Sequence, residues 1–385
     1  MGKYNFDIEI NRYNTNSLKF DIKRGRPNSI IPLWVADYDF KAPDFLIEEL
    51  KKKSEHGIFG YSEPLDSYFK ALKGWYQRQY GIDIDTSKIK LTNGVVFSIC
   101  QILRHLTKQG DSVIINEPVY YPFKSSILAN DRKVVINNLV LRDNKYYIDY
   151  EDFERKIQEN NVKLYILCNP HNPVGRAWRE EELLKIFEIC KRYNVFIISD
   201  EIHGDFVYGD NKFNSALKYL DKNFAVCSAL SKTFNIPGLQ IAHTYISDES
   251  VMNGFLHELD RVGYSQLSIF GLVGSEILFN QGDLYLKELK EYLWDNIQFV
   301  KTYLEKNLPK LKLILPEATY LIWIDFSAYG YSDKELRNII TNQANLWLDD
   351  GIMFGKSGSQ FQRINIATPR KRLKVVLENL YHTFK

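Results

Sequence analysis

Residues 163–200 read KLYILCNPHNPVGRAWREEELLKIFEICKRYNVFIISD. The stretch opens and closes with short apolar runs, KLYILCN and VFIISD, and each run ends in polar residues. In the segment between them, Leu183 and Phe187 lie four residues apart, which is the spacing of neighbours on one face of a helix. The stretch therefore predicts a strand, a helix and a second strand.

The same alternation of apolar runs and helical periods extends from about residue 90 to residue 250. Because the runs are continuously apolar and are separated by helices, they predict a mostly parallel sheet that is buried on both faces. The fold class is therefore α/β, and ligands are expected beyond the carboxyl ends of the strands. The other predicted strands are SVIIN (112–116), FAVCSAL (224–230) and IAHTYI (241–246).

The last third of the chain has a different pattern. A long helical stretch at 284–307 is followed by two apolar runs, a helix that starts near Ser332, the run FQRINIA and a closing helix. This order predicts a smaller α+β layer. We expect a large domain at 46–275 and a small domain formed by 1–45 together with 276–385.

Composition and charge exclude several classes of protein. The chain has 385 residues, with 50 Lys and Arg against 48 Asp and Glu, so it lacks the basic excess of a nucleic-acid binder. No window approaches the roughly 18 apolar residues of a membrane span. The four cysteines form no CxxC pair, and the N-terminus has no apolar secretory core, so we expect a cytoplasmic protein.

Three polar residues follow successive predicted strands and are suited to one kind of chemistry. Asn172, Asp200 and Lys232 come after the strands that end near 169, 200 and 230. A lysine amine that its surroundings deprotonate can form a Schiff base with a carbonyl, and an aspartate can hold a pyridinium nitrogen protonated. Upstream, TNGVV (92–96) leads into an apolar helix whose N-terminus could bind a phosphate.

Other motifs support different functions less well. Gly355-Lys356-Ser357 resembles part of a P-loop, but the glycine required five residues earlier is Asp350. A metallohydrolase could use a cluster of acids and histidines after residue 199, although strand alternation directs neighbouring side chains to opposite faces. A regulatory protein on the same fold would need a DNA-binding segment, and no basic helix-turn-helix precedes residue 31. The cluster comprises Asp200, Glu201, His203 and Asp205, with His171 as a further ligand.

Taken together, the segments resemble the pyridoxal-phosphate-dependent enzymes of fold type I, in the class I/II aminotransferase superfamily. The resemblance is greatest to its branch of cystathionine β-lyase-like C–S lyases. It rests on eight segments in order, namely IPLWVADYDF (31–40), GYSEP (60–64), NGVV (93–96), EPVYYPF (117–123), NPHNPVGR (169–176), SDEIHGDF (199–206), SKTFNIPGLQ (231–240) and FQRINIATPR (361–370).

The resemblance implies roles for the residues at the strand ends. Lys232 would form the Schiff base with pyridoxal 5′-phosphate and remove the Cα proton of the substrate. Asp200 would pair with the pyridine nitrogen, and Asn172 would donate to the phenolic oxygen. Ser231 and His203 are assigned to the cofactor as well.

The remaining implied cofactor contacts involve the phosphate and the ring face. The backbone N–H groups of Val95 and Val96 would hold the phosphate, and Tyr120 would stack on the ring, with Tyr121 as the alternative. Tyr61 would reach the phosphate of a neighbouring subunit, which implies a homodimer with active sites at the subunit interface.

The resemblance also implies contacts to the substrate, and the chain departs from the transaminase pattern at two positions. Arg363 would bind the α-carboxylate, close to the backbone of Trp34, Val35 and Ala36. Transaminases usually carry a tyrosine at the position of His203 and an arginine at that of Gln240.

Both departures favour a lyase. The predicted function is therefore α,β-elimination from cystathionine or another cysteine S-conjugate to a thiol, pyruvate and ammonia. The alternative is an aminotransferase of the same superfamily, and no metal is expected in the site.

Overall fold

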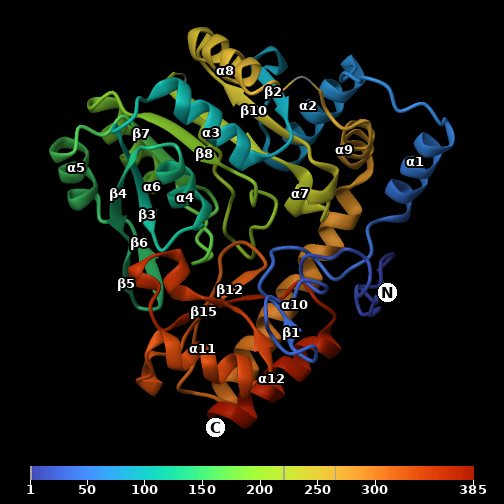
Figure 1. The fold of residues 1–385 in the computed structure, drawn as a ribbon, viewed down its shortest axis with the longest axis vertical. Coiled ribbons are helices and arrows are strands. Elements are labelled where there is room, and N and C mark those ends of the chain that lie inside the picture. The colour runs from blue at the N-terminus through green and yellow to red at the C-terminus, as the bar shows by residue number, and fades with distance from the viewer. Residues whose placement is uncertain (1, 220–221, 265) are drawn as a thin grey trace.

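The computed structural model describes residues 2–219, 222–264 and 266–385, and its centre is a seven-stranded sheet (Figure 1). The strand order is β2-β10-β9-β8-β7-β3-β4. Within this sheet β10 runs antiparallel to both neighbours, whereas the pairs from β9 to β4 are parallel. The predicted α/β class is confirmed. The strands are β2 (Ile89–Thr92), β3 (Ser112–Glu117), β4 (Lys133–Asn138), β7 (Leu164–Cys168), β8 (Phe196–Asp200), β9 (Phe224–Ser228) and β10 (Ala242–Ile246).

Helices cover both faces of this sheet, and the alternation of side chains along each strand fills both interfaces. On β8, Ile197 packs with the apolar residues of α5 and α6, whereas Ile198 packs with those of α3, α4 and α8. This two-sided burial explains why the strands are apolar throughout. The helices are α3 (Val95–Leu106), α4 (Pro122–Ala129), α5 (Tyr150–Glu159), α6 (Glu180–Arg192) and α8 (Glu249–Arg261).

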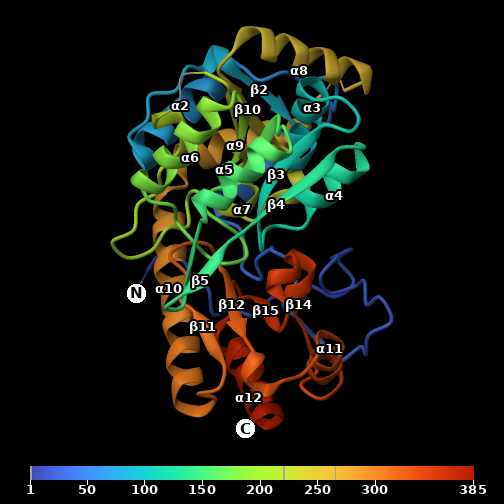
Figure 2. The ribbon, with the colours of Figure 1, turned by 90° about the vertical axis from the view of Figure 1, so that its left-hand side faces the viewer.

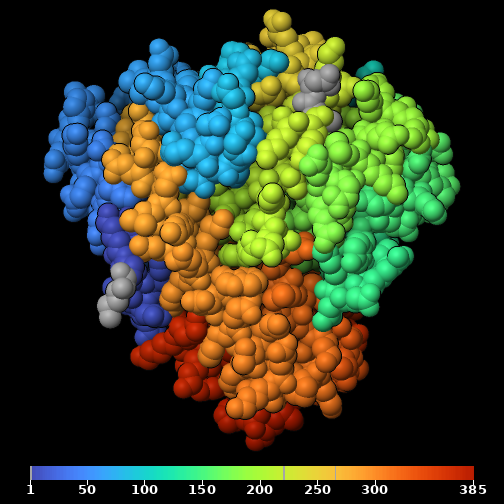
Figure 3. All heavy atoms as spheres, turned by 180° about the vertical axis from the view of Figure 1, so that it is seen from behind, coloured from blue at the N-terminus to red at the C-terminus, as the bar shows by residue number. Residues whose placement is uncertain are grey.

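A second layer lies below the large sheet and is built from the last third of the chain (Figure 2). Its antiparallel sheet has the order β11-β12-β15-β14. The orange segment that contains α10 runs from one layer to the other on the back of the molecule (Figure 3). The elements are α10 (Asp283–Asn307), β11 (Lys312–Ile314), β12 (Leu321–Asp325), α11 (Asp333–Asn342), β14 (Asp349–Asp350), β15 (Phe361–Asn365) and α12 (Arg370–Phe384).

The N-terminal segment packs on this second layer. Strand β1 (Ile31–Pro32) pairs in parallel with β13 (Leu346–Trp347), more than 300 residues later in the chain. We keep the division into 46–275 and 1–45 with 276–385 as a proposal. Its limits lie within α1 (Asp44–Glu55) and α9 (Ile269–Gln281).

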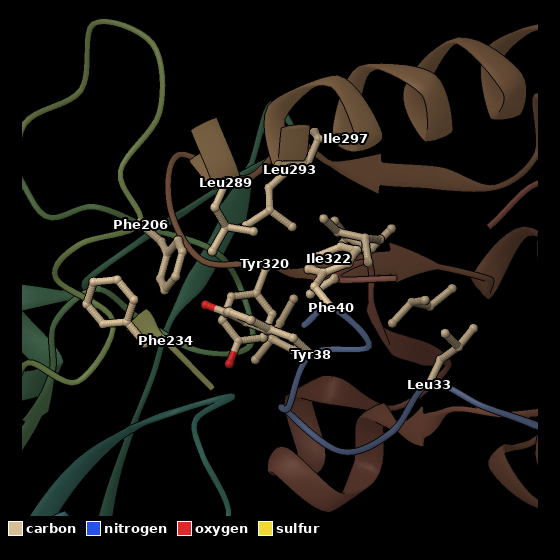
Figure 4. Close-up of a cluster of buried hydrophobic side chains, with 14 of the residues drawn as sticks. Leu33, Tyr38, Phe40, Phe206, Phe234, Leu289, Leu293, Ile297, Tyr320 and Ile322 are labelled. Carbon is tan, nitrogen blue, oxygen red and sulfur yellow. The ribbon is translucent and has the colours of Figure 1, made fainter. Parts of the chain in front are cut away.

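An aromatic cluster joins the two layers next to the large sheet (Figure 4). The ring of Tyr320 lies 4.8 Å from that of Tyr38 and 5.2 Å from that of Phe206, both in edge-on contact. Leu289 of α10 belongs to the same buried cluster. Residues from the N-terminal segment, from the loop after β8 and from the second layer therefore share one core. In the part of the chain that the structure describes, no helix has the length and apolar character needed to cross a membrane.

A buried group of charges fixes the N-terminal segment. The amine of Lys19 lies 3.0 Å from Asp39 Oδ1, and both side chains are almost completely buried. Arg12 and Arg372 also pair with Asp39, at 2.9 and 3.1 Å. Burial alone would raise the pKa of Asp39, but Lys19 and Arg372 outweigh it and hold that pKa below its ordinary value. The group thus links residues 12–39 to α12.

Replacing Lys19 with Met should lower the free energy of unfolding by about 3 kcal/mol, because Asp39 then stays buried with one cation fewer. The midpoint of urea unfolding measures this loss. Lys51→Met is the control, because Lys51 and its partner Glu48 are exposed and the midpoint should not move. Equal midpoints for the two variants would show that the buried group does not stabilise the fold.

Candidate active site

The predicted site residues meet in one cavity beyond the carboxyl ends of the large sheet's parallel strands. Its volume is about 380 Å³, and every predicted site residue except Tyr61 lines it. A larger cavity of about 630 Å³ between α10, β11 and the β5–β6 hairpin (Val140–Tyr147) contains none of them. The predicted residues that line the smaller cavity are Trp34, Val35, Ala36, Val95, Val96, Tyr120, Asn172, Asp200, His203, Ser231, Lys232 and Arg363.

Lys232 lies in the short helix α7 (Leu230–Thr233), just after β9. Its amine donates a hydrogen bond of 2.8 Å to the carbonyl of Ala36, which also accepts one of 3.0 Å from the Tyr320 hydroxyl. The side chain opens onto the cavity, yet protein surrounds the amine. Burial and then the Arg363 cation lower the pKa of Lys232 to about 8, against the opposing charges of Asp37 and Asp200. A useful fraction of the amine is therefore neutral and nucleophilic near neutral pH.

Asp200 is the last residue of β8, and its carboxylate faces the cavity. Burial raises its pKa to about 7, although the backbone N–H of Ile202 donates to Oδ1 at 3.1 Å and Lys232 also favours the charged form. Glu201 points away from the cavity and bonds to Ser215 and to the backbone of Ala216. This orientation follows the alternation expected along a strand. A cationic ring nitrogen beside Asp200 would supply the counter-charge that favours its ionised form.

His203 lies on the loop after β8 and remains neutral. Burial, followed by the cations of Lys232 and Arg363, lowers its pKa to about 3. Its Nδ1 is buried and has no hydrogen-bond partner among the described residues. An unpaired polar atom of this kind favours a ligand that completes the site.

The N-terminus of α3 closes another side of the cavity. The helix begins at Val95, and no side chain caps its first N–H groups. Val95 and Val96 therefore offer free backbone donors at the positive end of the helix dipole, which suits a phosphate. Gln240, at the position where transaminases carry an arginine, is exposed and does not line the cavity.

Arg363 enters the cavity from β15 of the second layer. Its Nη1 donates to Asn172 Oδ1 at 2.9 Å, its Nη2 donates to the Trp34 carbonyl at 3.0 Å, and Nη2 also bonds to Asp349. Asn365, two residues later, donates to the carbonyls of the segment 35–37 at 2.6 Å. Because Arg363 occupies its Oδ1, Asn172 retains its amide N–H groups for a ligand in the cavity.

Tyr120 and Tyr121 both line the cavity. The backbone N–H of Tyr120 donates to the Asn172 carbonyl at 3.0 Å, and burial raises the pKa of its hydroxyl to about 12. Tyr121 is more exposed, at 37%. The choice between the two rings as the stacking partner stays a prediction.

Tyr61 lies apart from the cavity, with 93% of its surface exposed. Its neighbours in the loop between α1 and α2 (Asp66–Tyr80) are also exposed apolar residues, namely Ile58, Phe59 and Leu65. An exposed stretch of this size is typical of an interaction surface. The predicted contact of Tyr61 with a neighbouring subunit stays a prediction.

Several residues of the site were absent from the sequence predictions, and three of them make informative contacts. Leu18 lines the cavity from the N-terminal segment, Tyr320 bonds to Ala36, and Asp349 pairs with Arg363. Leu18 and Tyr320 follow no strand that the pattern analysis associated with chemistry. Asp349 stands in the run LWLDDG (346–351), where two acids after an apolar run were the one available signal.

These groups fit pyridoxal phosphate. The cavity contains a lysine amine with a lowered pKa, a buried carboxylate at a strand end, uncapped N–H groups of a helix and an unpaired histidine nitrogen. They match the aldehyde, the ring nitrogen, the phosphate and the remaining polar atoms of that cofactor. No group of three or more metal-ligating side chains was found in the described residues.

Comparison with known proteins agrees with this fit. Residues 28–380 match the model of the family Aminotransferase class I and II. The chain is 39% identical to cystathionine beta-lyase PatB of Bacillus subtilis (strain 168) over 94% of its own length and 95% of PatB.

Solved structures agree as well. A PLP-bound putative aminotransferase from Clostridium difficile 630 superimposes with a TM-score of 0.96 at 40% identity, covering 99% of this chain and 100% of that one. Cystalysin from Treponema denticola, whose structure contains pyridoxal 5′-phosphate, gives 0.95 at 34% identity over 99% and 98%. The resemblance predicted from the eight segments is confirmed, and the chain belongs to the aminotransferase class I and II family, on the branch that includes PatB.

Proposed function

We propose that this protein is a pyridoxal-phosphate-dependent C–S β-lyase. It cleaves cystathionine or other cysteine S-conjugates to a thiol, pyruvate and ammonia. The observation that carries the proposal is the meeting of Lys232, Asp200 and Arg363 in one cavity, with the amine of Lys232 near its titration point at neutral pH. The likeness of the chain to PatB, which is named a cystathionine beta-lyase, supports β-elimination as the reaction.

Each residue performs a separate part of the elimination. When bound, pyridoxal phosphate offers an aldehyde to the substrate amine and a ring that accepts the electron pair left at Cα. Asp200 holds the proton on the ring nitrogen, and the Lys232 amine accepts the proton from Cα. Arg363 holds the α-carboxylate by charge-assisted hydrogen bonds and thereby fixes the Cα–H bond relative to Lys232.

The departures from the transaminase pattern favour elimination over transamination. An aminotransferase must deliver a proton to the former aldehyde carbon of the cofactor, whereas a β-lyase expels a thiolate from the β-carbon of the substrate. His203, which burial keeps neutral, replaces a tyrosine hydroxyl, and Gln240 replaces a phosphate-binding arginine. The cavity therefore relies on the α3 N-terminus and Ser231 to hold a phosphate.

We also infer that the enzyme is a homodimer in which Tyr61 of one subunit contacts the phosphate bound by its partner. Tyr61 and its apolar neighbours Ile58, Phe59 and Leu65 are exposed in the single chain, at 59–93% of their surface. Pairing two copies would bury this surface.

A cytoplasmic location is part of the proposal. All four cysteines are free thiols, and three of them are buried. Unpaired cysteines are typical of proteins in a reducing compartment.

The purified protein should be yellow and should release pyruvate and thiol from cystathionine without any keto acid. Lys232→Ala should lower this rate by at least about 10³-fold, because the variant lacks the group that accepts the Cα proton. Pyruvate and free thiol are measured in the same reaction. Product that forms only after a keto acid is supplied would identify an aminotransferase instead, and a colourless protein that binds no cofactor would contradict both functions.

In the cofactor-free protein, Lys232 should react with a neutral acylating reagent at lower pH than exposed lysines. The neutral amine is the reactive form, and its fraction rises as pH increases through the pKa of about 8. Labelling quantified by peptide mass spectrometry over pH 6–11 gives the midpoint. Lys51 is the internal control, because its hydrogen bond to Glu48 raises its pKa.

Asp200→Asn should move the midpoint of Lys232 further down, since Asp200 favours the charged amine. A midpoint equal to that of Lys51 would show that burial does not activate this amine.

Two inactive variants should restore activity to each other if Tyr61 acts across the dimer. Mixing Lys232→Ala subunits with Tyr61→Ala subunits creates hybrids in which one of the two sites has both residues intact. Activity should recover toward a quarter of the wild-type value for random exchange, because half of the dimers are hybrids with one intact site each.

Lys232→Ala mixed with Arg363→Ala is the matched control, because both residues belong to the same chain's cavity and no hybrid site is intact. Recovery in neither mixture, with subunit exchange demonstrated by mass, would show that Tyr61 does not act across the dimer.

A further inference from the structure

Asp349 is the acidic partner of Arg363. It lies on β14 directly opposite Arg363 on β15, and its carboxylate accepts a hydrogen bond from Nη2. Both residues are buried, with exposed fractions of 3% and 4%. Arg363 lines the cavity whereas Asp349 does not, so Asp349 holds the guanidinium from outside the space that a substrate would occupy.

The contacts of Arg363 leave its guanidinium little freedom. Nη2 donates both of its hydrogens, one to Asp349 and one to the Trp34 carbonyl, and Nη1 donates to Asn172. The guanidinium carbon also lies 4.8 Å from the ring centroid of Phe354. Asp349 is the one charged group among these four contacts, so its hydrogen bond is the strongest constraint on the orientation of the fork.

Asp349 also limits the positive charge that Arg363 presents to the cavity. After burial, the Arg363 cation is the largest cause that lowers the pKa of Lys232. A carboxylate in direct contact with the guanidinium offsets part of that field. It also spares the enzyme a buried cation with no counter-charge when the substrate is absent.

We propose that Asp349 is a positioning residue that orients Arg363 for the α-carboxylate of the substrate without contacting the substrate itself. The inference rests on the proposed function, in which Arg363 binds that carboxylate. Asp350, the next residue on the same strand, provides a matched comparison. It bonds to Arg337 and Gln362 rather than to Arg363, and removing it leaves the fork untouched.

Calorimetric titration of the holoenzyme with an unreactive carboxylate tests the inference. The probe is the deaminated analogue of S-methylcysteine, and its primary amide is the uncharged counterpart. Asp349→Ala should weaken binding of the carboxylate about tenfold or more and leave binding of the amide unchanged, because only the carboxylate needs the oriented fork. Asp349→Asn keeps an oxygen acceptor for Nη2 and should bind the carboxylate within about threefold of the wild type.

Steady-state kinetics provides the second measurement. With S-methylcysteine as substrate, kcat/KM should fall in Asp349→Ala by about tenfold or more, because a misoriented fork weakens binding of the carboxylate and also misplaces the Cα–H bond relative to Lys232. Asp350→Ala should match the wild type in both experiments. Cofactor absorbance and the thermal melting temperature identify any variant that fails to fold. If Asp349→Ala is such a variant, Asp349→Ser, whose side chain is too short to reach Nη2, takes its place with the same expected results.

Two results would overturn the inference. In one, Asp349→Ala binds the carboxylate as tightly as Asp350→Ala does. In the other, Asp349→Ala loses the carboxylate and the amide equally, which would indicate general damage to the cavity. A wild-type enzyme that cleaves no S-conjugate would instead refute the proposed function, and the titration would still decide whether Asp349 orients Arg363.

Discussion

The hydrogen bond between the Lys232 amine and the Ala36 carbonyl is the contact on which the site depends, because it joins the two layers at the reactive atom. Lys232 follows a strand of the large sheet, whereas Ala36 belongs to the N-terminal segment on the second layer. That segment is fixed by the pairing of β1 with β13, by Asn365 and by the buried charges around Asp39. The acceptor for Lys232 is therefore set by contacts spread over the length of the chain.

The charged groups in and around the cavity act on one another as well as being affected by burial. Lys232 and Arg363 are the cations that line it, and the Arg363 cation lowers the tendency of Lys232 to be charged. Asp200 inside the cavity and Asp37 just outside it oppose this effect. In the proposed function a phosphate would lie at the N-terminus of α3, and this would leave both cations for the amine chemistry and the carboxylate.

The positions of Asn172, Asp200 and Lys232 could be predicted because each follows a strand of a parallel sheet, and such strands end at one edge. The residues that sequence analysis missed obey no comparable rule. Asp349 meets Arg363 through an antiparallel register across the irregular segment between β14 and β15, which no short-range pattern specifies. Leu18 reaches the cavity through an N-terminal segment with little regular structure. Tyr61 was predicted, but its role stays a prediction because it involves a second subunit.

The two sheets supply different parts of the proposed active site. The large sheet supplies the proposed contacts to the cofactor, from α3 and from the ends of β7, β8 and β9, whereas Arg363 on β15 supplies the proposed contact to the substrate carboxylate. In the proposed function, the direction of the substrate's Cα–H bond relative to the Lys232 amine then depends on the relative position of the two layers. The aromatic cluster of Tyr38, Phe206 and Tyr320 occupies that junction, and Tyr320 also donates to Ala36. Packing between the layers is therefore part of the catalytic geometry, since a small displacement of one sheet would move the carboxylate relative to the base.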